Sequence, residues 1–481
     1  MFEYFGDMKE RWILIVGILL FTLLVAYRAA VLPITHDEAS TWLNFRHHNI
    51  WGCISDYYCW QTANNHWLNT LLLQWTAGLF GEGAFAIRLP NVLAGGLYFL
   101  AASLFSWRYI KTPMLQLAGF LLLCGNVYLL DFFSLARGYG LMVSGVIWSI
   151  YCLLRYIERF EFRWLLFSVV AMVLAVFSNF TALLALLSIG LAWLGWMIGH
   201  KKFSLIGRHG LLWLTTGIVL LGLLYYPIRT LSGSGEFEWG AASITETIND
   251  LLRNLLYGAQ YFGEGSRAIL FWIVIGALVL VLLATLLSKQ FNARAQLICL
   301  FSLLVFNLVG IVVLEYATGS QAPIGRKSIY LIPFIFAPLA LGLNLIKWGN
   351  LTFVFGVVFC GSMFYHTLHT LDLTKCREWY YDAYYPELFS TIFPNASNPD
   401  SVQLGSSWIF NPALTYYQKT KPLPLSGLVY QKTLVIDTTM QYYFVEQTDT
   451  VGMYQAGFVA NKKIGPYALF KNEAISTASV R

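Results

Sequence analysis

One stretch near the start of the chain decides the fold: residues 12–39 read WILIVGILLFTLLVAYRAAVLPITHDEA. Residues 12–32 are almost entirely apolar, so as a helix they can cross roughly 30 Å of hydrocarbon. The adjacent carboxylates Asp37 and Glu38 then emerge at the far membrane interface. This placement favours a reaction at the membrane surface, and the alternative is that the two charges only mark the end of a helix in water.

The composition of the whole chain is that of a membrane protein. Of its 481 residues, 57% are hydrophobic and only 12% are charged, which excludes an ordinary soluble globule. We expect about eleven membrane-spanning helices. The apolar runs are residues 12–32, 86–106, 114–131, 138–156, 164–178, 181–199, 210–227, 268–287, 296–314, 328–345 and 350–368. The fifth and sixth runs form one long stretch, which we divide at Ser178-Asn179. No cleavable signal peptide is expected, and the first helix is retained.

The distribution of basic residues predicts the orientation, because Lys and Arg in short loops stay in the cytoplasm. With a cytoplasmic N-terminus, the basic loops fall on the inner side. The outer side then holds the loops 33–85, 228–267 and 315–327 and the segment 369–481. The net charge of +6 is accounted for mainly by these topology signals, so no nucleic-acid partner is expected.

Three basic residues depart from this inner-side distribution, because they lie at or near the outer ends of predicted helices: Arg137, Arg326 and Lys327. A phosphate group at the lipid headgroup level suits them, because guanidinium binds phosphate bidentately and ammonium acts as a point charge. The alternatives are contact with lipid headgroups or pairing with Asp131 and Glu315.

Several short motifs occur in a characteristic order. They are the acidic pair after the first helix, Asn64-Asn-His-Trp-Leu-Asn-Thr-Leu-Leu72, Ala86-Ile-Arg-Leu-Pro90, Ala136-Arg-Gly-Tyr139 and Gly325-Arg-Lys-Ser-Ile-Tyr-Leu-Ile-Pro333. Over about residues 12–370 the chain resembles GT-C glycosyltransferases. It is most similar to the bacterial group of aminoarabinose transferases, protein O-mannosyltransferases and lipopolysaccharide-core glycosyltransferases.

The resemblance implies an inverting transferase in the bacterial cytoplasmic (inner) membrane, with a polyprenyl-phosphate-linked sugar as donor and a lipid, glycan or protein outside the cytoplasm as acceptor. The departing lipid phosphate has a second pKa of roughly 6, so no general acid is required. A carboxylate must take the proton of the acceptor hydroxyl, and Asp37 is the candidate, with Glu38 beside it. The expected phosphate ligands are Arg137, Arg326 and Lys327, and the other expected substrate contacts are His36, Asn65, His66, Asp131 and Tyr139.

The sequence is also compatible with other functions and with features that the resemblance does not require. A lipid-linked-sugar flippase would also need many helices and buried charge, and a polysaccharide polymerase or ligase differs mainly in the donor. No metal or other cofactor is required by the chemistry, although His36, Asp37, Glu38 and His66 leave a divalent cation as an alternative. Cys53 and Cys59 could form a disulfide outside the cytoplasm.

The predicted organisation is therefore an all-α polytopic membrane domain, residues 1–368, followed by a small α/β extracytoplasmic domain, residues 369–481. Ser243-Ile-Thr-Glu246 is a capping-box pattern that opens an amphipathic helix, which we expect to lie on the membrane. In the C-terminal segment, residues 433–437 and 468–471 are typical of strands, and residues 414–419 of a helix.

Overall fold

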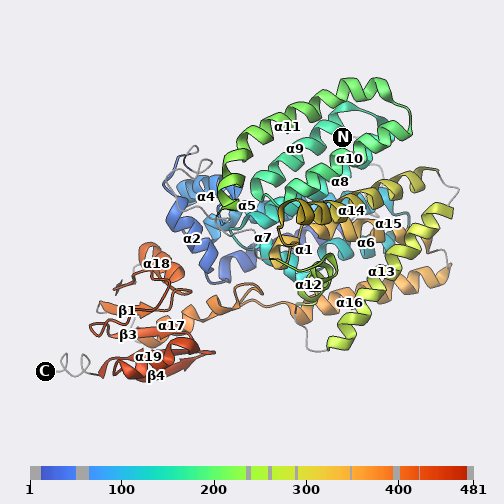
Figure 1. Cartoon of the computed structure of the whole chain (residues 1–481). Coiled ribbons are helices and arrows are strands. Elements are labelled where there is room, and N and C mark those ends of the chain that lie inside the picture. The colour runs from blue at the N-terminus through green and yellow to red at the C-terminus, as the bar shows by residue number, and fades with distance from the viewer. Residues whose placement is uncertain are drawn as a thin grey trace. The chain divides into compact units, whose positions relative to one another are not determined.

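The computed structural model describes residues 12–49, 52, 64–233, 240–257, 263–287, 291–346, 349–393, 401–421 and 423–473 (Figure 1). The chain forms two compact units. The first comprises Met1–Ala29, Asn49–Leu73 and Arg88–Leu371, and the second comprises Ala30–His48, Gln74–Ile87 and Asp372–Arg481. The second unit therefore combines the residues after the first helix with the C-terminal segment, whereas the predicted boundary near residue 369 follows the chain in linear order.

The first unit is built from helices. In chain order the helices that begin in it or cross into it are α1 (Trp12–Val31), α4 (Trp67–Phe80), α5 (Ala84–Tyr109), α6 (Pro113–Cys124), α7 (Val127–Phe133), α8 (Gly138–Arg159), α9 (Phe162–Ser178), α10 (Ala182–Gly199), α11 (Phe203–Ser232), α12 (Ile244–Leu255), α13 (Glu264–Leu287), α14 (Phe291–Thr318), η3 (Gly325–Ser328), α15 (Leu331–Gly342), η4 (Leu343–Leu345) and α16 (Asn350–Thr370).

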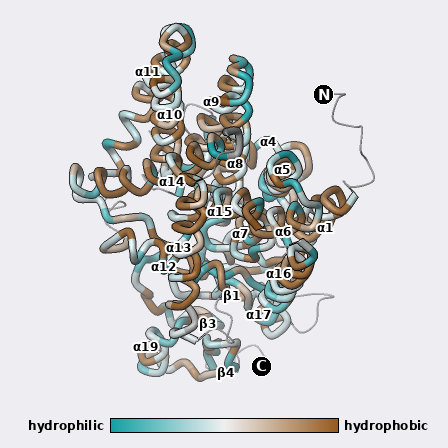
Figure 2. Tube along the Cα trace, turned by 90° about the vertical axis from the view of Figure 1, so that its right-hand side faces the viewer, coloured by the Kyte–Doolittle hydropathy of each residue, from teal (hydrophilic) through white to brown (hydrophobic). Residues whose placement is uncertain are grey.

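The longer of these helices can span a membrane. Within the described residues, 8 helices are long and apolar enough, and the bent pair α6 and α7 would make up to 9. The remaining two predicted spans correspond to shorter apolar helices, Phe162–Ser178 and Leu331–Leu345. Helices α13 and α14 are largely brown, and so hydrophobic, in Figure 2. The expectation of a polytopic all-α membrane domain is confirmed.

Two breaks in the helices bear on the site. The division at Ser178-Asn179 is confirmed, because α9 ends at Ser178 and α10 begins at Ala182. The predicted span 114–131 is not one continuous helix: α6 and α7 pass together as a candidate span but meet at an angle of 63°. Gly125 ends α6, and the Asn126 side chain accepts a hydrogen bond from the Leu129 backbone N–H at 3.2 Å, which starts a new helix.

Helix α12 has the predicted cap. Ser243 Oγ accepts from the Glu246 backbone N–H at 3.2 Å, and Glu246 Oε2 accepts from the Ala242 N–H at 2.8 Å. Its apolar residues, among them Leu251 and Leu255, are buried, and the helix packs against α7, α13 and η3. The apolar face of α12 therefore packs on protein, whereas we had expected it to lie on the membrane.

The second unit contains α2 (His36–Phe45) and a small sheet with short helices between its strands in the chain. Its C-terminal elements are η5 (Tyr380–Tyr384), α17 (Tyr385–Ile392), β1 (Val402–Ser406), α18 (Asn411–Thr420), β2 (Leu425–Ser426), β3 (Tyr442–Val445), η6 (Gln447–Asp449), α19 (Thr450–Gln455), β4 (Val459–Ile464) and β5 (Tyr467–Lys471). The strand order is β2-β1-β3-β5-β4. Strand β1 is parallel to both neighbours, and β5 is antiparallel to β3 and β4. The predicted α/β character is confirmed.

The local predictions for this segment had mixed outcomes. Residues 468–471 fall in β5 and residues 414–419 in α18, as predicted. The strand over 433–437 is wrong: Leu434 and Ile436 pack against the buried core, but no ladder forms there. The apolar residues of this segment alternate because one side of the chain packs on the core, although no neighbouring strand pairs with it. Cys53 and Cys59 lie outside the described residues.

Candidate functional site

Arg137 lies directly before α8, a helix whose residues are mostly buried. Its side chain is only 1% exposed. The guanidinium donates to Asn64 Oδ1 at 2.5 Å and to the Asn64 backbone carbonyl at 3.4 Å. It also lies 3.0 Å from His66 Nε2 and 6.0 Å from the ring centre of Tyr139. Two of the sequence motifs, the Asn64-Asn65-His66 segment and the Arg137-Gly138-Tyr139 segment, therefore meet in the first unit.

The contact with Arg137 fixes the protonation of His66. A guanidinium can only donate, so Nε2 accepts and the proton of the neutral ring sits on Nδ1. Asn179 Nδ2 lies 3.4 Å from that Nδ1, while the Asn179 oxygen accepts from Thr181 N at 3.0 Å. The His66 and Tyr139 rings meet edge to face at 5.0 Å.

Gly138 permits this close packing. A Cβ atom at Gly138 would lie 1.9 Å from the Ser178 carbonyl oxygen and 2.8 Å from His66 Cβ, so any larger residue would separate α8 from its neighbours. The same region is tied together by Asn69, which donates to the Ala136 carbonyl at 3.0 Å. Asn65, a predicted substrate contact, accepts from Thr70 Oγ1 at 3.1 Å.

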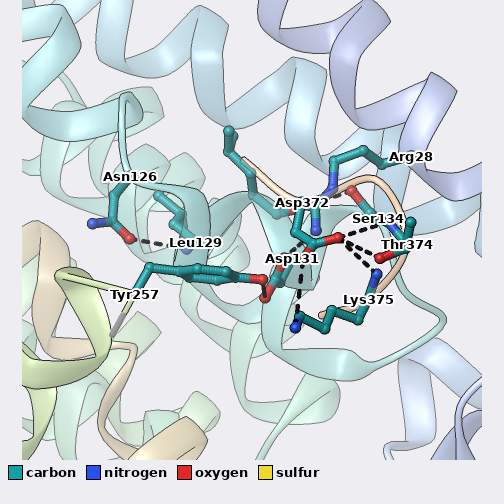
Figure 3. Close-up of polar contacts among 10 residues, drawn as sticks. Arg28, Asn126, Leu129, Asp131, Ser134, Tyr257, Asp372, Thr374 and Lys375 are labelled. Carbon is teal, nitrogen blue, oxygen red and sulfur yellow. Dashed lines mark hydrogen bonds and ion pairs between the residues drawn. The ribbon is translucent and has the colours of Figure 1, made fainter. Parts of the chain in front are cut away.

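Asp131 is the centre of a second polar group in the first unit (Figure 3). Arg28 forms an ion pair with Asp131 Oδ1 at 2.5 Å, and both side chains are almost fully buried. Tyr257 donates to Asp131 Oδ2 at 2.8 Å. Neither partner is predictable from the sequence: Arg28 lies in an apolar span, and nothing in the sequence near Tyr257 indicates a carboxylate neighbour.

Arg326 and Lys327 lie in the short 3₁₀ helix η3, and both are half-buried. The backbone before them turns at Gly325, where φ is 56°, a conformation that favours glycine. The Gly325 N–H donates to Asp250 Oδ2 of α12 at 2.7 Å. The capped amphipathic helix thus supports the segment that carries these two cations.

In the second unit, α2 begins directly before the acidic pair. Thr35 is its N-cap: Thr35 Oγ1 accepts from the Glu38 N–H at 3.4 Å, and Glu38 Oε2 accepts from the Thr35 N–H at 2.9 Å. Glu38 is fully buried, whereas Asp37 in the same turn is 9% exposed. The helix dipole favours negative charge at this end. The Glu38 carboxylate therefore has a capping role, and Asp37 is the better placed of the two for chemistry.

His36 is held by C-terminal residues of the same unit. Its backbone N–H donates to Asp382 Oδ2 at 2.7 Å, and its Nδ1 donates to the Ile409 carbonyl at 2.7 Å. With Nδ1 bound to this carbonyl, Nε2 is the ring nitrogen left to face a ligand. Burial raises the pKa of Asp382 well above the ordinary range, and the charges of Asp37 and Glu38 act in the same direction. Sequence reasoning missed Asp382, which lies 346 residues further along the chain.

The predicted site residues thus belong to two units. Arg137, His66, Asn65, Tyr139, Asp131, Arg326 and Lys327 are in the first, and His36, Asp37 and Glu38 are in the second. In the parts of the chain that the structure describes, no three His, Cys, Asp or Glu side chains gather into a group that could hold a metal ion.

The described helices, 8 of them long and apolar enough to cross a membrane, and the small α/β segment have a fold that other solved proteins share. ArnT from Cupriavidus metallidurans shares it. Its apo structure matches with a TM-score of 0.56 and 11% sequence identity, covering 96% of this chain and 98% of ArnT. The structure of ArnT bound to undecaprenyl phosphate matches with a TM-score of 0.55 and 12% identity at the same coverage.

At such low identity the likeness concerns the fold alone. The arabinosyltransferase EmbB from Mycobacterium smegmatis also matches, over 72% of this chain and 31% of EmbB, with 13% identity and a TM-score of 0.46, too low to carry an argument. No family model and no curated protein sequence matches the chain. The fold implied by the motif resemblance is confirmed.

Proposed function

We propose that this protein is an inverting glycosyltransferase that moves a sugar from a polyprenyl-phosphate donor to an acceptor outside the cytoplasm. The observation that carries the proposal is the fold, which is shared over nearly the whole of both chains with ArnT, a protein solved with undecaprenyl phosphate. The buried Arg137 side chain beside His66 and Tyr139 supports the proposal. Burial of a cation costs free energy unless an anion compensates its charge, so a buried arginine suits a phosphate-binding site.

In the proposed reaction the acceptor hydroxyl oxygen attacks the anomeric carbon of the donor sugar. The bond from that carbon to the phosphate oxygen breaks, and its electron pair leaves with the polyprenyl phosphate. Asp37 takes the hydroxyl proton as general base, a contribution of about 10² to 10⁴-fold. Arg137 and Arg326, with Lys327, stabilise the negative charge on the departing phosphate. A single displacement inverts the configuration at the anomeric carbon.

Asp37 is preferred to Glu38 as the base because of the local hydrogen bonds. Glu38 already accepts from the Thr35 backbone N–H, so its protonation would weaken the start of α2. Asp37 stands one residue away with a small exposed fraction, which suits a group that must meet a substrate in partly dehydrated surroundings.

The remaining proposed substrate contacts are His36, Asn65, His66, Asp131 and Tyr139. His36 Nε2 is an acceptor for a sugar or acceptor hydroxyl, because Nδ1 is bound to a backbone carbonyl. Asp131 acts through Arg28, whose guanidinium it orients. The scheme requires no cofactor. We place the reaction on the outer side of the bacterial cytoplasmic membrane, with the N-terminus inside and the C-terminal segment outside.

The test uses purified protein in detergent, so that no membrane barrier remains. The protein is given a polyprenyl-phosphate sugar extracted from the host and crude envelope acceptor, with neither ATP nor an ion gradient. We expect free polyprenyl phosphate to appear in step with sugar incorporation, and the product to have the opposite anomeric configuration.

The same experiment separates an enzyme from a flippase. A flippase leaves no covalent product once the bilayer is dissolved. If the donor binds but stays chemically unchanged with every acceptor fraction, while reconstituted vesicles move it between leaflets, the glycosyltransferase proposal is wrong.

A further inference from the structure

We infer that Asp382 is a positioning residue for Asp37, and that the C-terminal segment thereby forms part of the reaction centre. Asp382 accepts a hydrogen bond from the His36 backbone N–H at 2.7 Å, in the first turn of the helix that carries Asp37. The inference rests on the proposed function, in which Asp37 is the general base.

The first N–H groups of a helix have no partners within the helix. At the start of α2 the capping box serves the N–H groups of Thr35 and Glu38. The His36 N–H lies between them and needs an acceptor from elsewhere. A carboxyl oxygen can accept from it, and Asp382 Oδ2 lies within hydrogen-bond distance. Asp382 thus adds to the cap a contact that the local sequence does not supply.

Asp382 occupies a site that is unfavourable for a carboxyl group by itself. It is 2% exposed, and Asp37 and Glu38 bring like charges nearby. Burial of a carboxyl group costs free energy unless hydrogen bonds compensate it. The second oxygen of Asp382 accepts from the Tyr385 hydroxyl at 2.6 Å, and Tyr385 is itself fully buried. Each oxygen of the Asp382 carboxyl group thus accepts a hydrogen bond, and the two bonds fix its position.

Other C-terminal groups fix the same turn of the chain. The Ile34 N–H donates to the Tyr417 hydroxyl at 2.9 Å, and the His36 ring is bound to the Ile409 carbonyl. Asp37 follows directly, so its orientation depends on these contacts. A displacement of about 1 Å at a catalytic group can reduce turnover on the order of 100-fold.

The test compares Asp382→Ala with Asp382→Asn. The amide oxygen of Asn can still accept from the His36 N–H, and its NH₂ group can donate to the Tyr385 oxygen, whereas Ala does neither. We expect kcat of Asp382→Ala to fall about 10- to 100-fold with the KM for the donor unchanged within about twofold. We expect Asp382→Asn to retain at least about a third of kcat.

Hydrogen–deuterium exchange tests the same inference without relying on activity. The peptide 33–42 should exchange faster in Asp382→Ala, but not in Asp382→Asn. Asp437→Ala is the matched control, because Asp437 also caps a turn of the C-terminal segment, by accepting from the Thr439 N–H at 2.8 Å. It should leave exchange over 33–42 unchanged. If Asp382→Ala does not fold, Tyr385→Phe, which removes only the hydroxyl, should speed the exchange partially.

Failure of the proposed function and failure of the inference about Asp382 give different results. Absence of transfer by the wild-type protein removes the proposed function, while faster exchange in Asp382→Ala would still support the positioning of the turn. Unchanged exchange and wild-type kcat in a folded Asp382→Ala overturn the inference. So does an Asp382→Asn protein that is folded but as slow as Asp382→Ala, because the lost property would then be the charge.

Discussion

Neutralising Arg137 without removing it provides the sharpest test of the donor site. In Asn64→Asp a carboxylate would replace the amide oxygen that lies 2.5 Å from the guanidinium. The new ion pair satisfies Arg137 and should keep the local fold, but it competes with a bound phosphate. If Arg137 serves only the structure, the substitution is neutral or stabilising. If Arg137 binds the donor phosphate, donor affinity falls.

The expected loss of donor affinity follows from the contact that Arg137 would no longer make with the phosphate. A charge-assisted hydrogen bond from a desolvated guanidinium contributes about 1.5 to 3 kcal/mol. Since each 1.4 kcal/mol is tenfold in the dissociation constant, Arg137→Ala should weaken donor binding about 10- to 150-fold. Asn64→Asp should also weaken donor binding, while the thermal midpoint of unfolding stays at or above that of the wild-type protein.

The assay is binding of undecaprenyl phosphate to the purified protein in detergent or nanodiscs, with thermal unfolding measured on the same samples. Asn64→Gln serves as the control for a changed side-chain length without a charge. Wild-type affinity in folded Arg137→Ala and Asn64→Asp proteins would refute the assignment of Arg137 to the donor phosphate.

Four further outcomes are expected. Asp37→Asn should abolish transfer and leave donor binding nearly intact, because the amide cannot take a proton, and full transfer would shift the role to Glu38. Gly138→Ala should destabilise the protein by about 1 to 3 kcal/mol and weaken donor binding, since the new Cβ would overlap the Ser178 carbonyl. Gly78→Ala, with open space around its Cβ position, should be neutral or stabilising in the same thermal unfolding assay. Treatment with EDTA should leave the transfer rate unchanged, and a loss restored by added Mg²⁺ or Mn²⁺ would establish the divalent-cation alternative.

The sequence by itself determined the membrane class, the approximate spans and several local features. Transfer of apolar side chains into hydrocarbon is nearly additive along a segment, so a run of apolar residues is sufficient to predict a helix. The cap of α12 and the break after Ser178 were also predictable, because side chains and backbone groups only a few residues apart decide them. The motif order was enough to imply the GT-C fold.

Only the tertiary structure decided which polar groups meet. Arg28 pairs with Asp131 across 103 residues, and Asp382 binds His36 across 346 residues. The same applies to the 63° bend between α6 and α7 and to residues 433–437, which have strand-like alternation but no strand partner. A buried charge or N–H group must find a partner wherever the packing of the chain brings one. Sequence spacing carries no information on that choice, because the partner is set by the packing of whole helices rather than by neighbouring residues.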